Sequence, residues 1–233
     1  LIQALVTSNP SPAYVYRVAK IFADNGSGVR GDLGAVIRAI LLDYEARSPA
    51  VAANPGFGRL KEPLVRATSL MRALAVASNT GRFTNVMVAR PEEDLEEETL
   101  HSPTVFNFFE PDYVQPGSLA AAGLRAPEFE ILTSATAITV PDYLFKLIYA
   151  DRPAAPDSDT LCLDFGALLP NAQNPSALLD QLNVLFCGGG LSPFARDRIA
   201  AAMLTLPAGV TDLDRVRNAV YLVVSTAVGA VQK

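Results

Sequence analysis

Residues 11–42, SPAYVYRVAKIFADNGSGVRGDLGAVIRAILL, decide the fold class of this chain. Ser11 is a favoured N-cap residue, Pro12 suits the first helical position, and the apolar residues that follow recur at helical spacing. Asn25-Gly26 is a typical helix end, and Asp32 is placed to cap the next apolar stretch. The sequence therefore predicts two capped helices joined by a glycine-rich turn.

The same pattern of caps, prolines and helical apolar spacing continues along the chain. It predicts further helices near residues 62–77, 127–149, 175–186, 193–206 and 212–228. Asn174, Ser192 and Thr211 are the expected caps of the last three, and Pro141 predicts a kink or a restart in the 127–149 helix. Residues 161–165 are the one credible short strand, so strand is expected to be at most a short isolated hairpin. We predict a mainly α fold, an irregular multi-helix domain with long Pro/Gly-rich loops.

A domain division is expected near residue 150. Residues 151–160 contain two prolines and three aspartates with almost no large apolar side chain, which is typical of a linker. The predicted organisation is a helical domain over 1–150, a linker over 151–160, and a C-terminal helical subdomain over 161–233 that packs on the first.

Composition excludes several classes of protein. Half of the 233 residues are apolar, which is enough for a sizeable core. The net charge is −5 and the 19 Lys and Arg residues are scattered, so neither nucleic acid nor an anionic membrane is an expected partner. The apolar run 219–231 is shorter than the roughly 20 residues that a bilayer needs, so it predicts a buried helix and no transmembrane span.

The two cysteines, Cys162 and Cys187, have no spacing typical of a zinc site. In an exported protein they could pair and close a loop of about 25 residues. The alternative is two buried free thiols.

The sequence shows no known catalytic constellation, and no bound cofactor is expected. His101 is the only histidine, which excludes a two-histidine metal site. Asp112 and Glu128 are candidates, with Glu130, for the paired carboxylates of a hydrolase, a role that requires a separation of about 5 to 9.5 Å. Asp112, Glu128 and His101 are therefore the catalytic candidates that the sequence offers.

A calcium loop is the one metal site to consider. Asp24, Asn25 and Asp32 supply oxygen donors around a glycine-rich turn, but the EF-hand spacing is absent. The alternative is that these residues end one helix and cap the next.

Two further segments have both a structural and a binding interpretation. Phe106, Phe109 and Tyr113 are expected to be largely buried anchors of a non-helical segment; the alternative is an aromatic platform for a sugar or a peptide. The acidic stretch 92–98 is expected to be a solvated helix or loop anchored only by Leu95 and Leu100, and the alternative is a cation-binding surface.

Four groups of segments carry a family resemblance. They are residues 5–15 with 22–33; 39–43 with 61–64; SPTVFNFFEPDY (102–113) with 116–124 and 126–129; and 189–193 with 216–222. In these residues the chain resembles the C-terminal half of the bacterial exported domain-of-unknown-function family 1800. It departs from the family in the acidic stretch 92–98 and in its last residues, 225–233.

The resemblance implies an address outside the cytoplasm, because family members carry an N-terminal export signal. They are about twice as long as this chain. Residues 1–6 are apolar and have no helix start signal, so we expect them to continue a helix that begins earlier. We therefore expect the first helix to expose apolar surface that the N-terminal half or another chain covers, and a homo-oligomer is a further option. Two functions remain open: a structural or assembly component of a periplasmic or extracellular complex, and a hydrolase of an extracellular polymer with carboxylate general acid/base groups.

Overall fold

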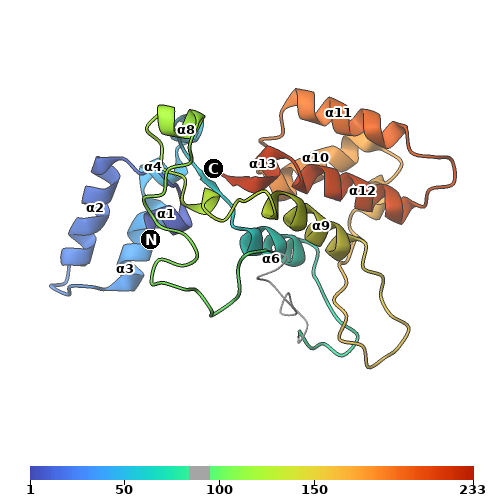
Figure 1. Cartoon of the computed structure of the whole chain (residues 1–233), viewed down its shortest axis with the longest axis horizontal. Coiled ribbons are helices and arrows are strands. Elements are labelled where there is room, and N and C mark those ends of the chain that lie inside the picture. Colours follow the sequence, from blue (N-terminus) through green and yellow to red (C-terminus); the bar gives the residue numbers. More distant parts are fainter. Residues whose placement is uncertain (84–94) are drawn as a thin grey trace. The chain divides into compact units, whose positions relative to one another are not determined.

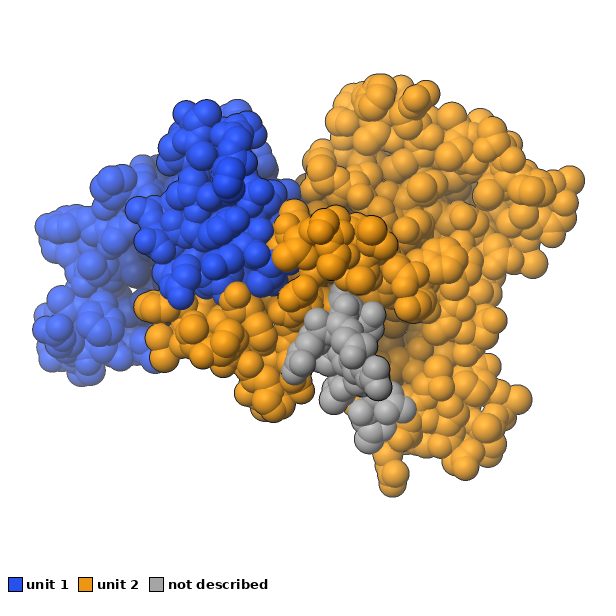
Figure 2. All heavy atoms as spheres, in the orientation of Figure 1, with its two compact units in different colours: residues 1–60, 109–131, 231–233 blue, residues 61–108, 132–230 orange. Residues whose placement is uncertain are grey.

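A computed structural model describes residues 1–83 and 95–233 of the chain. These residues form two compact units, each assembled from separate stretches of sequence (Figure 2). Unit 1 contains residues 1–60, 109–131 and 231–233, and unit 2 contains residues 61–108 and 132–230. Residues 151–160 form no helix or strand and belong to unit 2; the division into domains expected around them stays a prediction.

Unit 1 is built from short helices and one pair of strands (Figure 1). Its elements are α1 (Ile2–Leu5), α2 (Pro12–Ala23), α3 (Leu33–Leu42), α4 (Tyr44–Arg47), α5 (Pro49–Ala52), β1 (Arg59–Leu60), α8 (Ser118–Ala121), the 3-10 helix η1 (Pro127–Phe129) and β2 (Val231–Gln232). The predicted caps are confirmed: the Ser11 side chain accepts a hydrogen bond from Tyr14 N, and that of Asp32 accepts one from Ala35 N.

The core of unit 1 forms where α1, α2 and α3 meet. Its buried side chains are Ile2, Val6, Tyr14, Val18, Val36 and Ile40. Ile2 and Val6 are thus covered within unit 1, and the expectation of an exposed apolar first helix is wrong for both of them. Leu1 of the same segment is exposed.

Unit 2 is a bundle of longer helices (Figure 1). Its elements are α6 (Pro63–Ala73), α9 (Thr136–Ile148), the 3-10 helix η2 (Leu169–Asn171), α10 (Pro175–Cys187), α11 (Pro193–Leu204), α12 (Asp212–Val224) and α13 (Ala227–Ala230). Asn174, Ser192 and Thr211 each cap a helix as predicted. The core includes Leu70, Leu144, Leu178, Leu182 and Val220, all almost fully buried.

Strand is scarce, and the prediction of a mainly α fold is confirmed. In the described residues the one sheet has two strands, β1 and β2, which pair antiparallel with Arg59 opposite Gln232 and Leu60 opposite Val231. It joins distant residues and is therefore not a hairpin. The expected strand at 161–165 is reduced to a single antiparallel bridge between Cys162 and Ala77.

Several expected helices have different bounds; the one expected at 62–77, for example, ends at Ala73. The 127–149 helix is replaced by η1 and α9, because Thr133 and Thr136 exchange hydrogen bonds at the point where α9 begins. Pro141 lies inside α9 without ending it, and the packing of Val140 and Leu144 in the core compensates for the lost backbone bond. The apolar run 219–231 is divided among α12, α13 and β2. No described helix is both long enough and apolar enough to cross a bilayer.

Candidate functional site

Helix α3 has large apolar residues both toward the core and toward solvent. Its sequence, LGAVIRAILL, contains one charged residue, Arg38, and a helix of this composition is typical of a protein interior. Val36 and Ile40 face the core of unit 1 and are buried. Its remaining large apolar residues, however, are between 40% and 58% exposed: Leu33, Ile37, Leu41 and Leu42. One helix therefore presents a row of uncovered aliphatic side chains.

Helix α2, which lies beside α3 (Figure 1), adds exposed apolar side chains from Val15, Tyr16 and Phe22. We call Val15, Tyr16, Phe22, Leu33, Ile37, Leu41 and Leu42 the α2–α3 surface. An open groove of about 660 Å³ adjoins it. The groove is lined by Ile21, Asn25, Asp32, Gly34, Ala35, Arg38, Ala39 and Leu42. The groove is thus mainly apolar, with polar side chains among its lining residues.

An ion-pair network holds the two helices in place. Arg17 on α2 donates from Nε to Asp43 Oδ2 at 2.7 Å and from Nη2 to Glu45 Oε1 at 2.8 Å. The Arg17 guanidinium lowers the pKa of the Asp43 carboxyl. Burial raises the pKa of Glu45, but the hydrogen bonds that Glu45 accepts from Arg17 and Ser11 outweigh burial, so this pKa is lowered as well. Because Asp43 and Glu45 follow α3 directly, the network joins α2 to the end of α3.

Tyr14 forms a second link between the same helices. Its hydroxyl donates to the backbone oxygen of Ile40 at 2.5 Å, and the side chain is fully buried. Burial is the main cause that raises the pKa of Tyr14 to about 12. The core side of the α2–α3 pair is therefore fixed, while its outer side remains uncovered.

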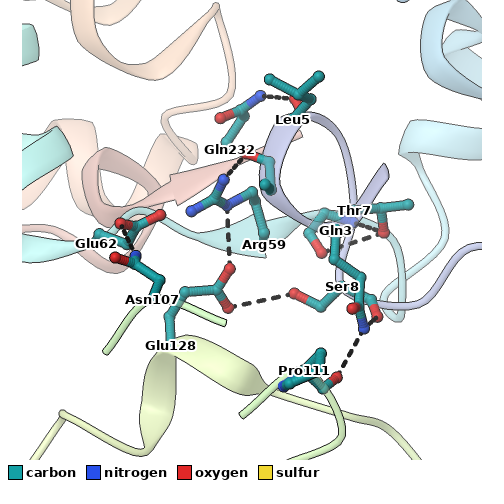
Figure 3. Close-up of polar contacts among 12 residues, drawn as sticks. Gln3, Leu5, Thr7, Ser8, Arg59, Glu62, Asn107, Pro111, Glu128 and Gln232 are labelled. Carbon is teal, nitrogen blue, oxygen red and sulfur yellow. Dashed lines mark hydrogen bonds and ion pairs between the residues drawn. The ribbon is translucent and has the colours of Figure 1, made fainter. Parts of the chain in front are cut away.

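A buried ion pair lies elsewhere in unit 1 (Figure 3). Arg59 Nε of β1 is 3.1 Å from Glu128 Oε1 of η1, and the Ser8 hydroxyl donates to Glu128 Oε2 at 3.4 Å. Arg59 also donates to the backbone oxygen of Ala4. All three polar side chains are buried, and they line a pocket of about 240 Å³. Removing one partner of such a pair leaves the other charge buried and destabilises the fold. The first role of this pair is therefore structural.

The three catalytic candidates have different surroundings in the structure. Glu128 belongs to the buried pair, whereas Asp112 is exposed, with Oδ2 3.9 Å from Arg125 Nη1, and is absent from the pocket lining. His101 belongs to unit 2 and is exposed, with Nδ1 3.0 Å from Glu98 Oε1. Their catalytic roles stay predictions.

The oxygen atoms of the expected calcium loop have internal donors. Asp24 Oδ1 accepts from Gly26 N and Gly28 N, and Asp32 Oδ2 accepts from Asn25 Nδ2 at 2.7 Å. Within residues 1–83 and 95–233, no cluster of three or more His, Cys, Asp or Glu side chains is arranged to hold a metal ion. The interpretation as a helix end and a cap accounts for each of these contacts, and calcium stays a prediction.

The aromatic segment is non-helical, as predicted, but the expected burial is wrong for Phe106 and only partly met by the other two rings. Phe106 is exposed, and Phe109 and Tyr113 are only half-buried. The segment is shaped instead by polar contacts: Asn107, with a backbone φ of +79°, donates from Nδ2 to Glu62 Oε2 at 3.1 Å. An asparagine tolerates this left-handed conformation better than most residues. The platform interpretation stays a prediction.

The acidic stretch makes a structural contact that the sequence does not predict. Glu97 is almost fully buried, and its Oε2 accepts from Leu64 N at 2.8 Å, so it caps the N-terminus of α6 from a distance. Leu95 is buried as expected, but Leu100 is fully exposed and anchors nothing. Residues 92–94 lie outside the described residues. No local signal in the sequence marks a cap contributed from so far along the chain.

Both cysteines are free thiols, Cys162 buried and Cys187 half-buried, and burial raises both pKa values. The structure thus has the second of the two arrangements expected for them.

These features define a mainly α protein with an exposed apolar helical surface. Its residues 1–227 match the family model described as protein of unknown function (DUF1800), and the chain belongs to that family. Neither the curated proteins nor the solved structures contain a match to it.

Proposed function

We propose that this chain is a structural or assembly component that binds another polypeptide through the α2–α3 surface. The observation that carries the proposal is α3, whose composition is that of an interior helix and whose Leu33, Ile37 and Leu41 are uncovered. Covering apolar surface contributes about 25 cal/mol per Å². Contiguous exposed apolar residues on a folded protein are typical of interaction sites.

Site-specific photo-cross-linking in the producing cell tests this proposal. A photoreactive residue replaces Ile37, and a matched variant carries it at Leu204, which is also exposed but lies on α11. We expect the Ile37 position to cross-link to one defined polypeptide and the Leu204 position not to do so. Absence of a product at Ile37, or equal products at both positions, would contradict the assembly role.

The same proposal places the chain in the periplasm or outside the cell. Its support is the resemblance to family members that carry an export signal. Fractionation of the producing bacterium, with the chain detected by antibody, tests the address. Recovery in the cytoplasmic fraction alone would overturn it.

A hydrolase of an extracellular polymer is the second candidate, and Glu128 is the observation that favours it. This carboxylate is buried yet lines a pocket, as a general acid or base does. If Glu128 is catalytic, Glu128→Gln lowers the rate of polymer hydrolysis at least ~100-fold. The rate of hydrolysis by Asp112→Asn tests whether Asp112 is the second catalytic carboxylate. An unchanged rate in the folded Glu128→Gln variant would exclude the role.

A further inference from the structure

Two cations of unit 2 border a small, partly enclosed cavity. Lys61 Nζ donates to the backbone oxygens of Gly229 at 3.1 Å and Phe186 at 3.4 Å, and Arg66 Nη2 donates to that of Val224 at 3.1 Å. All five residues line one cavity of about 20 Å³, which has room for roughly one water-sized particle. The two positive side chains therefore share one small space.

In the part of the chain that the structure describes, no carboxylate balances these two charges. Neither Lys61 nor Arg66 lies within ion-pair distance of a described acid, and no Asp or Glu is among the described residues that line the cavity. The backbone oxygens that they contact are neutral. Cys187 lies near Lys61, but burial raises the pKa of this thiol, so it is uncharged at pH 7.

Both cations carry their charge at a cost. Burial lowers the pKa of Lys61 and that of Arg66, and the charge of Arg66 lowers the pKa of Lys61 further. Two like charges that are partly removed from water are stabilised by an opposite charge placed between them. An anion in the cavity supplies that charge to both side chains at once.

Unused donors are available to hold such an anion. An ammonium group has three N–H donors, and Lys61 Nζ directs two of them to backbone oxygens. Arg66 Nε is fully buried and, among the described residues, has no hydrogen-bond partner. Ser69 lies three residues after Arg66 on α6, lines the same cavity and is exposed. Its hydroxyl is a third donor, and its exposure gives the cavity a side that solvent reaches.

We infer that Lys61, Arg66 and Ser69 form a binding site for a small monovalent anion of the halide class, such as chloride. The space fits a halide and excludes phosphate, sulfate and organic acids. The two cations also contact the last residues of α10, α12 and α13, which pack against one another (Figure 1). A bound halide therefore stabilises the packing of α6 against these three helices. The site is separate from the α2–α3 surface and does not depend on the proposed function.

Hydrogen exchange of the whole chain, measured by mass spectrometry, tests the site. It compares sodium chloride with sodium gluconate at the same ionic strength of about 150 mM, so that the screening of exposed charges is equal. Gluconate is too large for the cavity. Because a ligand of the folded state slows its opening, we expect exchange in α6 and α12 to be about tenfold slower in chloride, and exchange in α2 and α3 to be unchanged. Equal rates in the two salts, or equal slowing in α2 and α3, would overturn the inference.

Two variants locate the effect. Arg66→Gln is expected to abolish the difference between the salts, whereas Arg215→Gln is expected to keep it. Arg215 is the matched control because its Nε is also buried and, within the described residues, without a hydrogen-bond partner, but it does not line the cavity. A chloride effect that persists in Arg66→Gln would contradict the site. Crystals of the wild-type chain soaked in bromide give a test that needs no variant: an anomalous peak beside Lys61 and Arg66 is expected, and its absence would overturn the inference.

Discussion

At the position of Gly58, any other amino acid would force neighbouring backbone atoms to move. Thr7 Oγ1 accepts from Gly58 N at 3.0 Å, Ser8 N donates to Gly58 O at 3.0 Å, and an added Cβ would lie 2.6 Å from Gln232 O. The φ of +112° adds conformational strain for any side chain. We predict that Gly58→Ala lowers the free energy of unfolding by about 3 kcal/mol, measured by urea denaturation.

Gly117→Ala is the matched control, because Gly117 has a similar φ of +106° in the same unit and its added Cβ meets nothing within 4 Å. Its expected loss is smaller, because only the conformational part remains. Equal losses in the two variants would show that the contact with Gln232 does not constrain Gly58.

Ala75 has the opposite problem, since it occupies a position that suits glycine. It follows the end of α6 with a φ of +41°, and Val76 N donates to Met71 O as in a Schellman cap. Ala75→Gly removes about 1 to 2 kcal/mol of backbone strain. Glycine also raises the conformational entropy of the unfolded chain, which offsets part of this gain, so we predict a net stabilisation of roughly 0.5 kcal/mol. Gly188→Ala at the end of α10, where φ is +57° and the space is open, is expected to destabilise. A destabilised Ala75→Gly variant would contradict this account.

At the scale of elements, the α2–α3 pair is expected to weaken in alkali. The pKa of Tyr14 is about 12 in the folded chain against 10 in the unfolded chain. The folded state therefore keeps a proton that the unfolded state loses, and the stability gained is complete below pH 10 and is lost as the pH rises through about 12. Two pKa units correspond to about 2.7 kcal/mol. We expect a smaller loss of stability over this window in Tyr14→Phe than in the wild type, measured by urea denaturation; equal losses would contradict the role of Tyr14.

Helix starts were predictable because their causes are local. Ser11, Asp32 and Ser192 each bind an amide three residues ahead, so the sequence contains both partners of the cap within one turn. The Arg59–Glu128 pair and the Glu97 cap were not predictable, because their partners lie far apart in the chain and only the fold brings them together. Glu128 was named from the sequence as a catalytic candidate, but its guanidinium partner was not foreseen.

The exposure of α3 could likewise not be predicted from the spacing of its apolar residues. Its apolar spacing predicts a core face, which Val36 and Ile40 occupy, but the spacing cannot state how many of the remaining apolar residues find a neighbour. The sequence predicted an uncovered apolar surface on the first helix, but Ile2 and Val6 are buried. The exposed apolar side chains belong to α3 instead.

At the scale of the whole molecule, two units with their own cores account for folding, and the α2–α3 surface is one apolar surface that neither core covers. Hydroxyl-radical footprinting tests this most directly, because it compares the oxidation rates of exposed side chains in the chain alone and in the native assembly isolated from the producing cell. The account predicts that Tyr16 and Phe22 are protected in the assembly while Phe194, exposed on α11, is oxidised at an unchanged rate. Equal oxidation of Tyr16 and Phe22 in both samples would contradict a covered α2–α3 surface.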